Sequence, residues 1–141
     1  MEFQTKYQGV VELQLEDIIH FNSGIPGFPE EGEFIILPLE EGTFYILQSV
    51  KTPSLAFVMV NPFTYFPDYD FTVEDQTVEA LKIASPDDVI VYSILTVQDP
   101  FEKTTANLQA PIIINSKNKM GKQIVLNHDG YTTRHNIMEK R

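Results

Sequence analysis

Short runs of β-branched and aromatic residues, separated by Pro and Gly, recur along most of the 141-residue chain. Residues 10–15 alternate apolar and polar side chains, which is typical of a half-buried β-strand. Residues 34–39 and 44–50 are two β-rich runs joined by a Gly-containing connection at 40–42, which predicts an antiparallel hairpin. Residues 55–60 are apolar at both odd and even positions, so both faces of a strand there would be apolar. We therefore expect them to form the central strand, covered on both faces. The pattern predicts a mostly β domain.

A loop, one helix and a further strand follow from local signals. Residues 22–29 are dense in Pro and Gly and predict a long structured loop. Thr72 and Asp75 resemble a capping box, and the short apolar stripe after them predicts a helix over about residues 74–83. The β-branched run at 89–97 predicts a long strand.

The last third of the chain predicts a second hairpin and then loses its pattern. Residues 111–115 and 123–126 are apolar and flank the polar, basic stretch 116–122, whose Gly121 suits a turn or a bulge. From about residue 128 onward the periodicity fades, which predicts a loop or a partly mobile tail. No internal repeat or linker divides the chain, so residues 1–141 are expected to form a single domain.

Charge is divided unevenly along the chain. Residues 1–102 contain 18 Asp or Glu and three Lys, a net charge of −15, whereas residues 103–141 contain seven Lys or Arg and two acidic residues, a net charge of +5. Together these give the overall net charge of −10. Because like charges repel, we expect the acidic body to favour basic protein partners and not to bind nucleic acid directly.

Composition sets the expected environment. Cys is absent, which excludes disulfides and thiolate chemistry and fits a reducing compartment. The first residues have no signal-peptide pattern, and no apolar run approaches the ~18 residues needed to span a bilayer. Hydrophobic residues make up 43% of the chain, which is ample for a folded core. We therefore expect a cytoplasmic protein that has no membrane partner.

Candidate chemistry is sparse. The histidines, His20, His128 and His135, lack metal-ligand spacing and are expected to be structural or on the surface. Asp68 and Asp70 share one parity of a segment whose aromatic residues share the other, so we expect the carboxylates to point outward. No catalytic or nucleotide-binding motif is present. We predict a non-enzymatic protein without cofactor or metal; the alternative is a small metal-dependent or carbohydrate-active enzyme that uses the exposed carboxylates.

Two segments suit partner binding. Residues 61–69 contain four aromatic residues, three of them between Pro62 and Pro67, and these rings either plug one end of the core or form the apolar centre of an interface. Residues 104–111 are small, mostly polar and uncharged, and suit backbone pairing at a sheet edge or a partner laid across them. The candidate partner-binding residues are Asn61, Phe63, Tyr65, Phe66, Asp68, Asp70, Thr105, Asn107, Leu108 and Asn115.

At these segments the chain resembles the flagellar assembly factor FliW family. The likeness extends in order over nearly the whole length and is carried by residues 5–9, 21–28, 47–49, 61–63, 66–69, 105–108, 110–112, 121–123 and 131–135. The resemblance implies a small antiparallel β-barrel-like domain without catalytic activity. It also implies two protein partners that compete for the chain: flagellin, and the dimeric RNA-binding protein CsrA, which represses flagellin translation.

The resemblance further implies a partner switch. Accumulated flagellin occupies the factor and frees CsrA to silence flagellin mRNA, and export of flagellin returns the factor to CsrA. We hypothesise that acidic residues, among them Asp68, Asp70, Asp87 and Asp88, repel RNA from CsrA without occupying its RNA site; acidity that only keeps the protein soluble is the alternative. A further alternative is a chaperone that binds flagellin but no regulator. The two-fold symmetry of CsrA predicts two copies of this chain per CsrA dimer.

Overall fold

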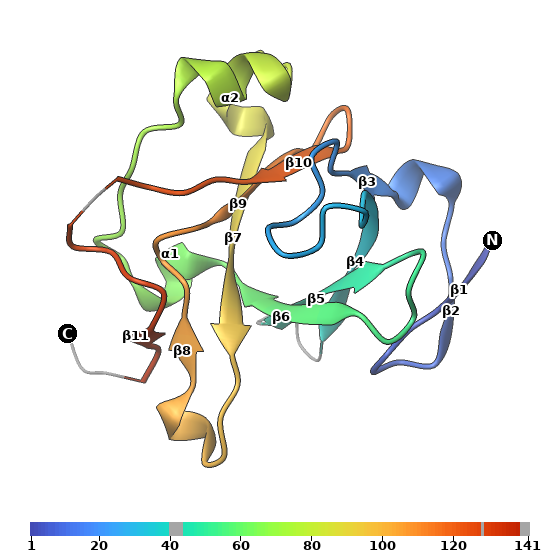
Figure 1. Cartoon of the computed structure of the whole chain (residues 1–141), viewed down its shortest axis with the longest axis horizontal. Helices are drawn as coiled ribbons and strands as arrows, with labels where there is room; N and C mark the ends of the chain where they lie inside the picture. The colour runs from blue at the N-terminus through green and yellow to red at the C-terminus, as the bar shows by residue number, and fades with distance from the viewer. Residues whose placement is uncertain (40–43, 128, 139–141) are drawn as a thin grey trace.

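The computed structural model describes residues 1–39, 44–127 and 129–138, which form a mostly β domain (Figure 1). The strands are β1 (Glu2–Gln4), β2 (Val10–Glu12), β3 (Ile19–His20), β4 (Glu33–Leu39), β5 (Phe44–Ser49), β6 (Ala56–Val60), β7 (Val89–Thr96), β8 (Thr105–Ala106), β9 (Ile112–Asn115), β10 (Met120–Gln123) and β11 (His135–Asn136). The helices are α1 (Pro62–Tyr65) and α2 (Asp75–Ala80), and single 3₁₀ turns are η1 (Leu15–Asp17), η2 (Pro86–Asp88) and η3 (Phe101–Lys103).

The strands curve around a common interior. β1 and β2 form a separate hairpin, and the other strands pair in the order β11-β8-β7-β6-β5-β4-β3-β10-β9. β9 pairs in turn with β7, so the pairings lead from β7 through β6, β5, β4, β3, β10 and β9 back to β7. β8 and β11 lie outside this circuit. The return depends on one parallel residue pair, Met120 with His20, where β10 meets β3. The sheet is therefore barrel-like, with a narrow seam in place of a continuously bonded closed barrel, and not wholly antiparallel.

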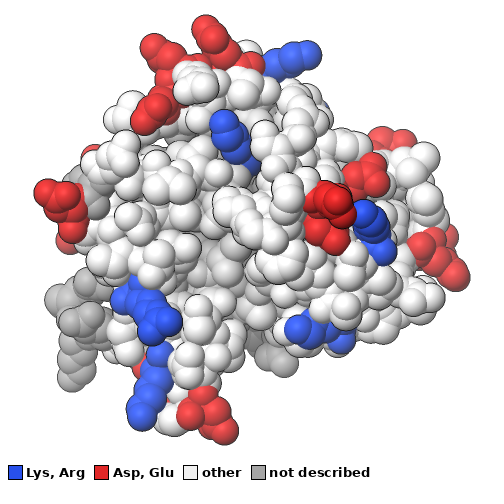
Figure 2. Space-filling model, viewed as in Figure 1, with Lys and Arg blue, Asp and Glu red and all other residues white. Residues whose placement is uncertain are grey.

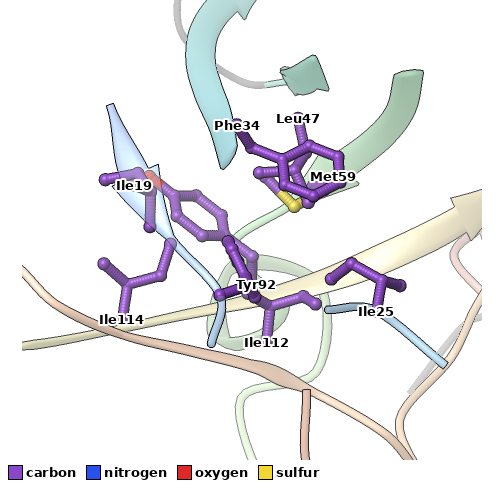
Figure 3. Packing of buried hydrophobic residues seen from close by; sticks show 9 residues of the cluster. Ile19, Ile25, Phe34, Leu47, Met59, Tyr92, Ile112 and Ile114 are labelled. Carbon is purple, nitrogen blue, oxygen red and sulfur yellow. The ribbon is translucent and has the colours of Figure 1, made fainter. Parts of the chain in front are cut away.

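The hydrophobic core lies on both sides of this curved sheet. The interior cluster contains Phe21 and the residues of Figure 3, which are Ile19, Ile25, Phe34, Leu47, Met59, Tyr92, Ile112 and Ile114. A second cluster packs β6 and β7 against the C-terminal segment, and a third packs the β1–β2 hairpin against β4 and β5. Met59 and Val60 are fully buried in different clusters, which confirms that 55–60 is a central strand covered on both faces.

Several predicted elements are confirmed. β4 and β5 pair antiparallel as the predicted hairpin, although its connection at 40–42 lies outside the described residues. The 22–29 segment is a loop closed by a bridge between Ile25 and Phe28, and β7 occupies the predicted strand at 89–97. The predicted helix is α2, but the capping box is wrong because the N-cap is Glu74 and makes no side-chain bond.

The second hairpin has a different register from the predicted one. β10 begins at Met120, so the turn is shorter than 116–122 and Gly121 lies within the strand, opposite Ile114. A glycine is needed at this strand position because the buried Phe21 ring lies close to the backbone: a Cβ on Gly121 would lie 2.7 Å from Cζ of that ring. The glycine therefore makes room for an aromatic side chain and does not make a turn.

Two terminal predictions are corrected. The N-terminal strand ends at Glu12, and Leu15, expected to be half-buried, begins η1 with 62% of its surface exposed. The tail from about 128 is not all loop: β11 pairs with β8, and Ile137 is buried beside that pairing. A two-residue strand anchored by one apolar side chain is too short for a periodicity to reveal.

Candidate partner-binding surface

The local sequence around Asn61 builds α1, a single helical turn that the sequence did not predict. Asn61 is the N-cap, and its side chain accepts a hydrogen bond from the Phe63 backbone N–H at 2.9 Å. Pro62 occupies the first helical position, where its fixed φ favours the helix and its missing N–H costs nothing. Among the described residues the structure therefore has two short α-helices where the sequence predicted one.

α1 directs its aromatic side chains to different neighbours. Tyr65 stacks on Phe44, with ring centroids 6.3 Å apart, and Phe44 meets the edge of Phe101 at 5.7 Å. Phe63 contacts Tyr69 at 5.7 Å. Phe63 is 42% exposed and Phe101 39% exposed, while Phe44 and Tyr65 are half-buried. We call Phe44, Phe63, Tyr65 and Phe101 the α1 aromatic surface; it has two parts, Phe63 beside Tyr69, and Tyr65 with Phe44 and Phe101.

The segment after α1 is tied to the C-terminal segment. The Tyr69 hydroxyl donates to the Leu108 carbonyl at 2.7 Å, and burial, aided by neighbouring Tyr131, raises the Tyr69 pKa. The Tyr131 hydroxyl accepts from the Asp70 N–H at 2.9 Å and donates to the Asp70 carbonyl at 3.1 Å. Phe66 is buried against His135. These contacts hold the backbone that carries the exposed carboxylates.

Asp68 and Asp70 are exposed while Tyr69 is buried, which confirms the predicted alternation. Asp68 helps to line a hollow of about 260 Å³, together with Tyr69, Leu108, Tyr131 and His135. The arrangement offers aromatic surface next to negative charge. Such a combination suits the apolar centre and polar rim of a protein interface.

The 104–111 segment does not present the free sheet edge that was one expectation for it. Thr105 pairs with β7 on one side and with Asn136 of β11 on the other. The Asn107 side chain accepts hydrogen bonds from the N–H groups of Gln109 and Ala110, so it caps a local turn. Leu108 is 2% exposed and belongs to the core. The chain's own C-terminal strand covers the edge.

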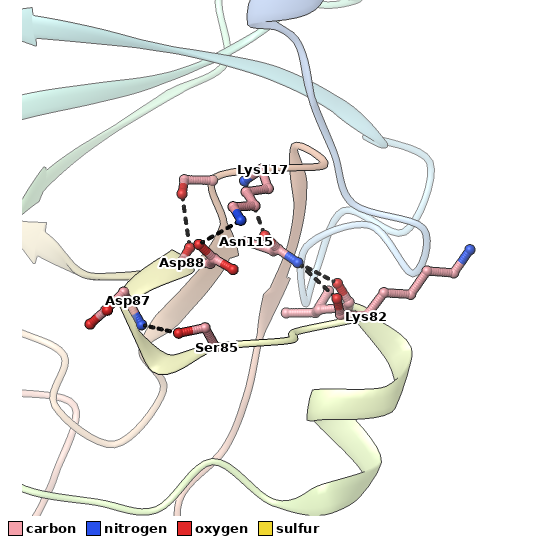
Figure 4. A network of polar contacts seen from close by, with 8 residues as sticks. Lys82, Ser85, Asp87, Asp88, Asn115 and Lys117 are labelled. Atoms are coloured by element: carbon pink, nitrogen blue, oxygen red, sulfur yellow. Dashed lines mark hydrogen bonds and ion pairs between the residues drawn. The ribbon is translucent and has the colours of Figure 1, made fainter.

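Asn115 is also internal and has a structural role (Figure 4). It is 2% exposed, and its side-chain amide donates to the carbonyls of Leu81 at 2.9 Å and Lys82 at 3.2 Å. Nearby, Asp87 is exposed, but Asp88 is buried with Lys117 at 3.8 Å. Asp88 was included among the acidic residues hypothesised to repel RNA, and its burial beside Lys117 removes it from that set.

The structure therefore brings together only part of the candidate set. Phe63 and Tyr65 lie on the α1 aromatic surface, with Asn61, Asp68 and Asp70 nearby in sequence and exposed. Three candidates, Phe66, Leu108 and Asn115, are buried and support the fold. Sequence reasoning missed Phe44 and Phe101, which complete the surface, because no local pattern links residues so far apart in the chain.

The described part of the chain shows no group of three His, Asp or Glu placed to hold a metal ion. His20 lies 3.8 Å from Glu33, and His135 accepts a hydrogen bond from the Thr132 N–H, so both have the surface or structural roles expected of them; His128 lies outside the described residues. Among the helices of residues 1–39, 44–127 and 129–138, none is both long enough and apolar enough to span a membrane.

Comparisons with known proteins agree with one another. The sequence model of the family described as "FliW protein" matches residues 2–137. The flagellar assembly factor FliW of Geobacillus kaustophilus (strain HTA426) is 50% identical over all of this chain and 98% of its own length. That of Bacillus subtilis (strain 168) is 52% identical, covering 97% of this chain and 96% of its own. A crystal structure of the flagellar assembly factor FliW superposes with a TM-score of 0.95 at 49% identity, covering 100% of this chain and 99% of that one.

Proposed function

This chain belongs to the FliW family of flagellar assembly factors. We propose that in flagellar assembly it acts without catalysis, as a switch between two protein partners. In this proposal it binds CsrA and lifts the repression of flagellin translation. Flagellin competes for it, so unexported flagellin releases CsrA. The switch operates in the cytoplasm, with two copies of the chain on each CsrA dimer.

The observation that supports this proposal most directly is the α1 aromatic surface with its carboxylate neighbours. Aromatic residues dominate the centres of protein interfaces, where a few of them provide most of the binding free energy. Phe63 leaves 42% of its surface exposed to solvent. A partner that covers Phe63 would bury apolar area that folding leaves exposed.

In this proposal, exposed acidic side chains inhibit the binding of RNA to CsrA. Asp68, Asp70 and Asp87 are exposed, and the body that carries them has a large net negative charge. Docked beside a basic RNA-binding surface, these carboxylates lower the local potential within about a Debye length, ~8 Å at physiological salt. Asp88 does not contribute, because it is buried and the exposed Lys117 ammonium lies 3.8 Å from it.

A matched pair of substitutions tests the binding surface. Phe63 and Phe28 are 42% and 40% exposed, and each makes one aromatic contact, at 5.7 Å to Tyr69 and 5.8 Å to Phe57. Phe63→Ala should weaken CsrA binding by about tenfold or more, measured by calorimetry, whereas Phe28→Ala should change it by less than about threefold. Equal effects would remove the α1 aromatic surface from the proposal.

Two further measurements separate the parts of the switch. A double substitution, Asp68→Asn with Asp70→Asn, should keep CsrA binding but relieve part of the inhibition of RNA binding; unchanged inhibition excludes the electrostatic contribution. Light scattering of the chain with CsrA should show a complex with two copies of the chain per CsrA dimer. Added flagellin should dissociate this complex. A chain that binds flagellin and never CsrA would be a flagellin chaperone instead.

A further inference from the structure

A second apolar surface shares no residue with the α1 aromatic surface. Five aliphatic side chains from three segments line one groove of about 440 Å³, and all five are half-buried: Val73, Val78, Ile83, Val89 and Val91. Ala84 and Pro86 are exposed at its margin. Folding has gathered these side chains without covering them. Apolar surface of this kind marks a binding site more often than a defect.

The groove is open because α2 does not lie across β7. The side chains of β7 alternate, so Val89 and Val91 face the groove while Tyr92 faces the interior core. In Figure 1, α2 sits beyond the end at which β7 begins, and not over its outer face. Leu81, just after the helix, is buried, and Asn115 and Asn118 both donate to its carbonyl. The helix is thus anchored at its C-terminal end, and the outer face of β7 stays only half-covered at Val89 and Val91, although it is buried further along at Ser93 and Leu95.

Acidic residues adjoin the groove-lining residues in the chain. Asp75 begins α2, Glu79 directly follows Val78, and Asp87 directly follows Pro86; all three are exposed, and we call them the acidic rim. Lys82 is the only cation between residues 73 and 91. Figure 2 shows acidic side chains gathered over α2, at the top of the view. A groove with an apolar floor and an acidic rim is complementary to a basic amphipathic segment.

We propose that the groove between α2 and β7 binds a basic amphipathic segment of a partner protein. The aliphatic side chains of that segment enter the groove against Val78 and Val89, and its Lys or Arg residues lie along the carboxylates of the rim. Long basic side chains suit this position, since their stems cover apolar surface while their charged ends stay in solvent. The partner can occupy this groove while the α1 aromatic surface holds another.

Two synthetic peptides provide the probe. Both carry Leu at helical i, i+3, i+4 and i+7 spacing, and the remaining positions are Lys in one and Glu in the other. Titrated into the full chain, the Lys peptide should shift the methyl NMR signals of Val78, Ile83, Val89 and Val91, and added salt should weaken the effect. Ile90, which lies on the other face of β7, is the internal control and should not shift.

Substitutions locate the binding. Ala84 and Ala80 are both exposed, but only Ala84 lines the groove. Ala84→Trp should abolish the shifts by filling the groove, whereas Ala80→Trp should leave them unchanged. Glu79→Gln should raise the Kd of the Lys peptide by about threefold, and Glu30→Gln, an exposed carboxylate elsewhere, should not.

The proposal fails if the Lys peptide shifts no groove methyl, if the Glu peptide shifts them equally, or if Ala84→Trp binds as the unaltered chain does. It stands or falls apart from the CsrA switch, because Phe63→Ala, which tests that switch, should leave the peptide titration unchanged.

Discussion

Gly121→Ala tests how the seam of the sheet is held. Gly121 lies in β10, next to the single residue pair that joins β10 to β3, and Phe21 directly follows β3. A Cβ at position 121 would lie 2.7, 3.0 and 3.1 Å from three atoms of the Phe21 ring. These separations are below van der Waals contact, so the ring or the strand must shift.

The expected cost follows from what surrounds the ring. Phe21 is 1% exposed and packs edge-on against Phe34, with centroids 5.4 Å apart, so it has no open space to enter. Overpacking of this kind costs about 1–3 kcal/mol, offset by the ~0.5 kcal/mol that Ala gains over Gly through the unfolded state. We expect a net loss of about 1.5 kcal/mol. For a chain of this size that lowers the Tm by about 5 °C.

Thermal and urea unfolding measure the change, and a second glycine provides the control. A Cβ on Gly32 would meet only the Phe21 carbonyl oxygen, at an ordinary 3.4 Å. Gly32→Ala should therefore be neutral or slightly stabilising. The double variant with Phe21→Leu should recover at least about 1 kcal/mol of the Gly121→Ala cost as coupling energy.

A neutral Gly121→Ala, or a cost that is the same with Leu at position 21, would refute the reasoning. Either result would mean that the ring does not set the identity of residue 121. Loss of stability in Gly32→Ala as large as in Gly121→Ala would point to the backbone of both glycines instead.

Two further outcomes are expected. Burial alone would raise the pKa of Glu31, but hydrogen bonds from Ser49 at 2.5 Å and Thr52 at 2.7 Å outweigh it and lower this pKa from 4.5. The stabilisation of the folded state by ionised Glu31 is therefore complete above about pH 4.5 and is lost as pH falls through the lowered pKa. Glu31→Gln should lower the free energy of unfolding, measured with urea, by about 2 kcal/mol at neutral pH and by much less in acid. A loss of stability that does not change with pH would contradict this. Asn115→Ala should cost about 2 kcal/mol, because it leaves the carbonyl oxygen of Leu81 with one donor fewer, and should speed hydrogen exchange in α2 more than in β5; equal changes in both would exclude this anchoring role.

The sequence by itself determined the elements whose signals are local. Alternation and continuous apolar runs identified β4, β5, β6 and β7, because the period of a strand is written in consecutive residues. The same local rule placed Asp68 and Asp70 in solvent and Tyr69 inside. The ordered set of short motifs identified the family, which the comparisons then showed.

Only the tertiary structure decided which surfaces meet. Phe66, Leu108 and Asn115 were candidate partner-binding residues, and they are internal because the C-terminal segment and the end of α2 pack over them. Phe44 and Phe101 joined Tyr65 through the pairing of strands distant in sequence. Whether a side chain is buried depends on which distant segment packs against its face of the strand or helix. The residues next to it in the chain do not indicate which segment that is.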